Sequence, residues 1–129
     1  MRRGLGRRLA QERRGAIGVE VALLALPMTL LMFGAIEVGM TLKTRAALQY
    51  GAELAARCAA VTPLTCSTGA QVQAYVAPRL SGMTLPSGAF TLASSTCGKL
   101  VTASMAYNGA ASHVLRTPVT LSARSCFPV

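Results

Sequence analysis

Residues 21–42 read VALLALPMTLLMFGAIEVGMTL, and this stretch decides the fold. It carries one charge, at Glu37, in an otherwise apolar run. About 20 helical residues cross a hydrocarbon core that is roughly 30 Å thick. A helix that is hydrophobic on every side could hardly be hidden in a soluble fold of 129 residues. We therefore predict a transmembrane helix.

The segment before the span is strongly basic and sets the expected orientation. Residues 1–15 contain one acid, Glu12, and six arginines: Arg2, Arg3, Arg7, Arg8, Arg13 and Arg14. Lys43 and Arg45 are the basic residues just after the span. Positive charge favours the cytoplasmic side, so residues 43–129 are expected outside the cytoplasm, in the periplasm.

The overall composition argues against several classes of protein. The chain is 52% hydrophobic and has a formal net charge of +9, but about half of that excess lies in the leader. The remainder has few aromatic residues and no basic stripe, so no nucleic-acid partner is expected. There is no aspartate, and His113 is the only histidine. We expect neither an enzyme nor a bound cofactor or metal.

The junction between leader and span reads RRGAIGVE, residues 13–20. A glycine that ends a basic leader, with a glutamate five residues later, resembles the prepilin-peptidase site of type IV pilin-like proteins. The resemblance implies cleavage after Gly15, which leaves Ala16 as the new N-terminus. Glycine suits a scissile position because it is side-chain-free and conformationally permissive. An ordinary secretory signal is the poorer match, since the apolar run is long and no small-residue cleavage site follows it.

Glu20 is the chemically notable residue of this junction. A carboxylate at the edge of the hydrocarbon core is costly unless it is paired. After cleavage the α-amine of Ala16, on the same chain or on a neighbouring subunit, would supply a cation. The alternative is an interfacial glutamate whose side chain reaches the lipid headgroups.

Further residues make the resemblance more specific. The TadE-like family, minor pseudopilins of the tight-adherence (Tad, or Flp) pilus, shows a glutamate, an apolar stretch, a proline and then Gly-x-x-Glu. Glu20, Pro27, Gly34 and Glu37 occupy those places, and the resemblance extends over residues 13–60. It implies three partners: prepilin peptidase, other Tad pilins or pseudopilins, and the inner-membrane assembly platform. The lipid bilayer is the fourth expected partner.

Past the span, the sequence predicts a continued helix, so that one helix runs from about Ile17 to Ala60. Residues 43–60 are alanine-rich and free of proline. Apolar residues recur at helical spacing, opposite a polar face. The apolar face comprises Ala47, Tyr50, Leu54 and Cys58, and the polar face Arg45, Gln49, Glu53 and Arg57.

Residues 61–129 predict a small α+β head. Thr68 and Gln71 have capping-box spacing, so a short helix is expected from Gly69. Period-two alternation then predicts three antiparallel strands. The first strand is marked by Phe90 and Leu92, the second by Val101, Ala103, Met105 and Tyr107, and the third by Val119, Leu121 and Ala123. We expect His113 in a solvated loop.

The four cysteines all follow the span, which favours two disulfides in an oxidising compartment. If the second and third strands are antiparallel, Cys126 falls roughly opposite Lys99 and within reach of Cys97. Cys58 and Cys66 then close a short loop. We favour these two pairings over the two other connectivities, and a head this small needs such bridges.

The predicted fold class is therefore α+β, with a long pilin-like N-terminal helix and a disulfide-bonded head. The expected organisation is a cleaved leader at residues 1–15, a transmembrane helix at 16–42, its amphipathic continuation at 43–60 and the head at 61–129. The N-terminus would be cytoplasmic and the protein single-pass in the inner membrane.

The expected function is that of a minor pseudopilin-like component of Tad pilus assembly, which supports pilus biogenesis, adherence and secretion. The alternative is an uncleaved bitopic envelope protein whose outer domain is structural or regulatory. The sequence leaves open whether the chain enters the filament, initiates its tip or stays in the membrane.

Overall fold

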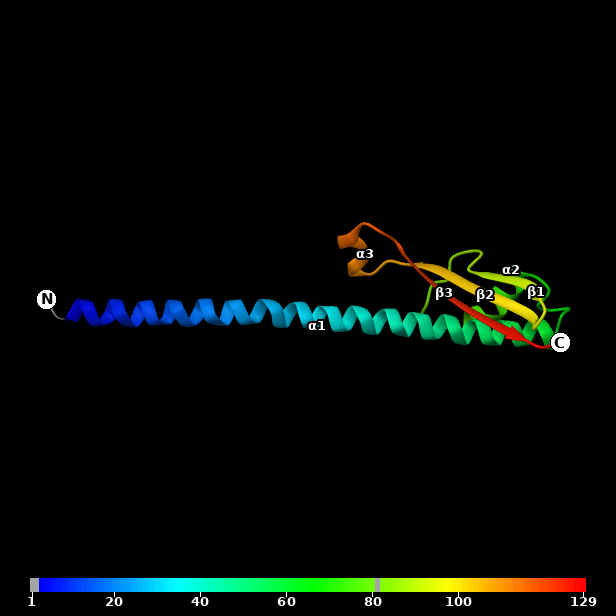
Figure 1. Cartoon of the computed structure of the whole chain (residues 1–129), viewed down its shortest axis with the longest axis horizontal. Helices are drawn as coiled ribbons and strands as arrows, with labels where there is room; N and C mark the ends of the chain where they lie inside the picture. The colour runs from blue at the N-terminus through cyan, green and yellow to red at the C-terminus, as the bar shows by residue number, and fades with distance from the viewer. Residues whose placement is uncertain (1–2, 81) are drawn as a thin grey trace. The chain divides into compact units, whose positions relative to one another are not determined.

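The computed structural model describes residues 3–80 and 82–129, with side chains from residue 17 onward except those of residues 111, 114 and 115. The chain forms two compact units, Met1–Val38 and Gly39–Val129. Figure 1 shows the elements, which in chain order are α1 (Arg3–Val61), α2 (Gly69–Val76), the 3-10 turn η1 (Ala77–Arg79), β1 (Phe90–Ser95), β2 (Gly98–Tyr107), α3 (Ala110–Leu115) and β3 (Val119–Phe127). The predicted α+β fold with a long N-terminal helix is confirmed.

Helix α1 begins earlier than the sequence analysis expected. It starts at Arg3 rather than near Ile17, and it ends at Val61. Arginine, leucine and glutamine are good helix formers, which explains helix in the leader. Pro27 lies inside α1 and does not end it.

The sheet has the order β1-β2-β3, with both pairings antiparallel. Phe90 lies opposite Ala103, and Ala103 lies opposite Ala123 on the other side. These three residues are buried together, because directly paired residues of neighbouring strands point to the same face of the sheet. The three predicted strands are confirmed, although Val119, at the start of β3, is 39% exposed.

The outer part of α1 packs on that face with a side that only partly matches the predicted one: Cys58 is buried, and Ala47 and Leu54 pack against the core. Tyr50 was expected to be buried and is 52% exposed. The buried stripe is displaced by about one residue and consists of Leu48, Gly51, Ala52, Ala55, Ala56 and Ala59, with Cys58 beside it. A Cβ on Gly51 would lie 3.1 Å from Phe90 Cζ, so a small residue is what lets the helix approach the sheet.

Helix α2 completes the core and carries the predicted cap. The Thr68 hydroxyl accepts a hydrogen bond from the Gln71 N–H, and the Gln71 side chain accepts one from the Thr68 N–H, both at 3.3 Å. Val72 and Val76 are fully buried in the core. The helix passes into η1 at Ala77 because a proline follows at residue 78.

The connection between β2 and β3 was predicted wrongly. We expected a loop, whereas residues Ala110–Leu115 form the short helix α3. His113 is exposed, but on this helix. The helix has six residues, which is less than two turns, so the spacing of its apolar residues could not distinguish it from a loop.

Both predicted disulfides are present, Cys58–Cys66 and Cys97–Cys126. The register differs by one residue from the expected one, since Cys126 lies opposite Leu100 rather than Lys99. The two bridges differ in accessibility. Cys58 and Cys66 are 7% and 1% exposed, whereas Cys97 is exposed at the turn that joins β1 to β2.

We expect loss of the exposed Cys97–Cys126 bridge to destabilise the head more than loss of the buried Cys58–Cys66 bridge would. Cys97–Cys126 joins residues 29 apart and Cys58–Cys66 residues 8 apart. Chain entropy then gives about 3.5 kcal/mol for the former and about 2.5 kcal/mol for the latter. Cys97→Ser should lower the amount of exported protein on an immunoblot, while processing after Gly15 stays normal. Unchanged amounts would contradict this.

Candidate membrane-spanning segment and processing site

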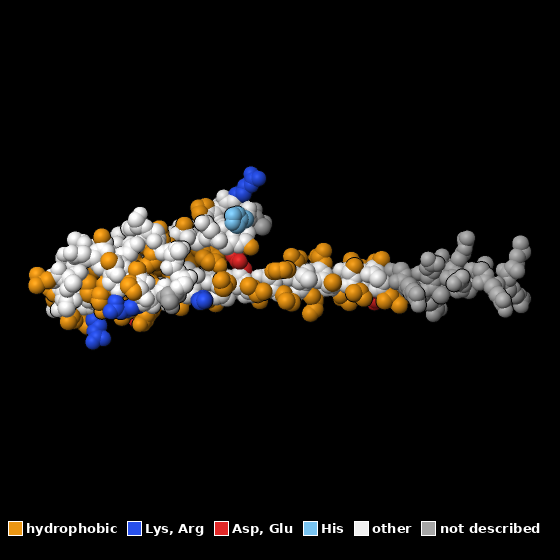
Figure 2. Space-filling view, turned by 180° about the vertical axis from the view of Figure 1, so that it is seen from behind, with side chains coloured by type: hydrophobic (Ala, Val, Ile, Leu, Met, Phe, Trp, Pro, Cys, Tyr) orange, Lys and Arg blue, Asp and Glu red, His pale blue; other side chains and the backbone are white. Residues whose placement is uncertain are grey.

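The apolar half of α1 buries none of its large side chains. From Ile17 to Leu42 the large hydrophobic side chains are between 52% and 74% exposed. Figure 2 shows them along this stretch of the helix. By length and composition α1 contains a segment that could span a membrane. Such a surface is costly in water and suited to lipid.

The polar side chain of Thr29, within this stretch, has a partner that suits a bilayer. The Thr29 hydroxyl donates to the carbonyl oxygen of Leu26 at 2.9 Å. This bond satisfies the hydroxyl within the helix, so that it needs no water. The ionisable residues of the stretch are Glu20 and Glu37, near its two ends.

The structure describes only part of the predicted processing site. Gly15 and Ala16 lie within the bounds of α1 but outside the residues whose side chains are described. Glu20 is described and is exposed on α1. Residues four apart lie on the same side of a helix, so positions 16 and 20 share one side. Processing itself stays a prediction.

A second feature lies in the unit Gly39–Val129 and was missed by the sequence analysis. A pocket of about 260 Å³ lies between α1 and the end of η1 with the segment that follows it. We call it the Lys43 pocket. Its lining residues are Met40, Lys43, Thr44, Ala47, Tyr50, Arg79, Leu80, Gly82 and Met83. The residues come from two segments some 30 positions apart, and no local motif links them.

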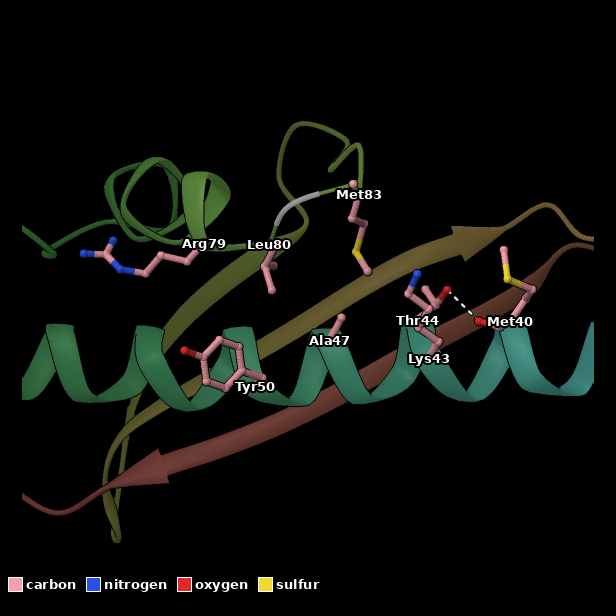
Figure 3. Close-up of a pocket in the computed structure, with 9 residues that line it drawn as sticks. Met40, Lys43, Thr44, Ala47, Tyr50, Arg79, Leu80 and Met83 are labelled. Atoms are coloured by element: carbon pink, nitrogen blue, oxygen red, sulfur yellow. Dashed lines mark hydrogen bonds between the residues drawn. The ribbon is translucent and has the colours of Figure 1, made fainter.

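The lining of the Lys43 pocket is mostly apolar and includes two basic residues, Lys43 and Arg79. Figure 3 shows Leu80 and Met83 directed toward α1, where Lys43, Thr44 and Ala47 lie. Leu80 is 5% exposed. None of the described residues that line this pocket is acidic.

The two cations of the pocket differ in how they are held. The guanidinium of Arg79 lies 3.9 Å from the centroid of the Tyr75 ring and donates to the Tyr75 carbonyl oxygen. In Figure 3 it points away from Lys43. Stacking and hydrogen bonding hold Arg79 against α2. Lys43 is exposed and lies beside the apolar lining.

The head offers no metal site among the described residues. No group of three or more His, Cys, Asp or Glu side chains there could hold an ion. All four cysteines are in disulfides and so cannot act as thiolate ligands.

The comparisons with known proteins bear on the helix alone. The model of the family described as TadE-like protein matches residues 15–57, which confirms the resemblance seen in the sequence. No curated protein and no solved structure matches the chain. The match thus ends where the second half of the chain, with its sheet and disulfides, begins.

Proposed function

Because residues 15–57 are a TadE-like segment, we propose that this chain is a minor pseudopilin-like component of Tad (Flp) pilus assembly. Its family associates it with that pilus. One observation carries the finer proposal: the match begins at Gly15, the residue after which cleavage is expected. A family match that starts at the expected cut fits a processed pilin-like subunit, whose mature part begins there.

The proposed topology follows from charge and composition. Residues 1–15 stay in the cytoplasm, residues 16–42 cross the inner membrane and residues 43–129 lie in the periplasm. The six arginines of the leader support this orientation. The two disulfides of the unit Gly39–Val129 support this orientation independently, since disulfides persist in oxidising compartments.

The proposed partners are prepilin peptidase, the other Tad pilins or pseudopilins and the assembly platform. The exposed apolar surface of α1 supports a role in which the helix is surrounded by lipid before assembly and by other helices afterwards. In such bundles, association depends on close packing and on satisfied polar groups rather than on the hydrophobic effect. Glu20 is the polar group that such a bundle would have to satisfy.

We expect prepilin peptidase to remove residues 1–15. Mass spectrometry of protein extracted from membranes should find an N-terminus at Ala16. A strain that lacks the peptidase should retain the intact chain. Gly15→Val should also block cleavage, because it adds a branched side chain at the scissile bond.

Gly18→Ala is the matched control for that variant. A Cβ at Gly18 would meet nothing within 4 Å in the structure, and the residue lies past the cut. Gly18→Ala should be processed normally. An intact Met1 in cells with active peptidase would instead support the uncleaved bitopic protein and contradict the pseudopilin.

A further inference from the structure

We propose that the Lys43 pocket binds one anionic phospholipid from the outer leaflet of the membrane that α1 crosses. The ammonium group of Lys43 would bind the lipid phosphate, and the apolar lining of the pocket would contact the glycerol end of the acyl chains. This goes beyond the proposed function and uses only one part of it, the insertion of residues 16–42 into a bilayer.

The position of Lys43 along the helix supports this ligand. Lys43 follows directly after Leu42, the last residue of the apolar run. A lysine at the end of a membrane-spanning segment extends its ammonium group to the interface while its alkyl chain covers apolar surface. The pocket is thus placed at the depth where lipid phosphates occur.

The lining of the pocket has the two halves that a phospholipid needs. Met40, Leu80 and Met83 supply flexible, apolar contacts for a chain. Lys43 supplies a point charge for a phosphate, and no carboxylate among the described lining residues competes for it. The Thr44 hydroxyl already donates to the Met40 carbonyl oxygen at 2.9 Å, so the phosphate depends on Lys43.

The charge of the whole outer unit favours an anion over a second copy of this chain. Residues 39–129 contain seven Lys and Arg against one acid, Glu53, which gives a formal charge of +6. Two such units repel each other, whereas an anionic leaflet attracts them. A volume of about 260 Å³ is slightly below that of a drug-sized pocket and holds part of one lipid.

The test uses the full-length protein extracted in a neutral detergent, which has no charged surface of its own. Phosphatidylglycerol or phosphatidylcholine is added, and retained lipids are counted by native mass spectrometry. We expect one phosphatidylglycerol to be retained in preference to phosphatidylcholine. Lys43→Gln should raise the dissociation constant about fivefold, as expected for one cation near an anionic lipid.

Arg45→Gln is the matched control, because it removes the same charge two residues later and Arg45 does not line the pocket. It should leave lipid retention unchanged. Met83→Ser should weaken retention of both lipids through the apolar contact, and intact disulfides on each variant verify folding. Excess inorganic phosphate should not displace the lipid.

Four outcomes would overturn the assignment. Equal losses with Lys43→Gln and Arg45→Gln would mean a general effect of charge. Equal retention of the two lipids would mean no headgroup recognition, and full displacement by phosphate would mean a plain anion site. A protein that is processed and membrane-bound but retains no lipid refutes the pocket alone. A chain that keeps an intact Met1 in cells with active peptidase refutes the proposed function instead.

Discussion

Glu20→Ala is expected to abolish surface piliation while membrane insertion remains normal. The substitution makes the span more apolar, so insertion should not suffer, and the Gly15–Ala16 bond is unchanged. Assembly should fail because the α-amine of Ala16, or the site that receives Glu20, is left as an uncompensated charge in a low-dielectric bundle. Such a defect typically costs several kcal/mol, and each 1.4 kcal/mol is about tenfold in an equilibrium.

The measurement is a count of surface pili in a strain that lacks the wild-type protein. Glu20→Gln should fail almost as fully, because it keeps the shape of the side chain and removes its charge. Glu53→Gln is the matched control, since Glu53 is an exposed carboxylate on the same helix beyond the span. Normal piliation with both Glu20 variants would show an ordinary interfacial glutamate.

Gly98→Ala is expected to cause the largest loss of stability in the head. Gly98 has φ +122°, a region that residues with a side chain rarely adopt. A Cβ there would overlap the Phe127 carbonyl oxygen and lie 2.8 Å from Pro128 Cα. The end of β3 cannot simply move away, because Cys126 is bonded to Cys97 next to this glycine. Strain and overpacking together should cost about 3 kcal/mol or more.

Thermal unfolding of the full-length protein in detergent measures this effect. For a small domain each 1 kcal/mol lowers Tm by about 4–8 °C, so a fall of at least about 12 °C is expected. Gly88→Ala is the control, since Gly88 has φ +77° and open space around its missing Cβ. It carries the backbone strain without the overlap and should lose much less. Equal falls in Tm for Gly98→Ala and Gly88→Ala would contradict the prediction, because the overlap with Phe127 would then add no loss of stability.

Several features of this protein follow from its sequence alone, because their causes are local. A run of apolar residues on every side of a helix suits only lipid, wherever the rest of the chain lies. Thr68 and Gln71 form their capping box within four residues. Alternation identifies the strands, and their order along the chain brings Cys97 and Cys126 together even when the register is misjudged by one residue.

The tertiary structure alone decided which side of α1 is buried and where the Lys43 pocket lies. Hydrophobicity favoured Tyr50, but the sheet approaches closely only where the helix presents Gly51, Ala52 and Ala55. The size of side chain that fits at each position of α1 depends on the sheet opposite, whose residues are distant in sequence. The pocket likewise forms because the segment that contains Met83 packs near Lys43 of α1. Neither segment's sequence by itself predicts this packing.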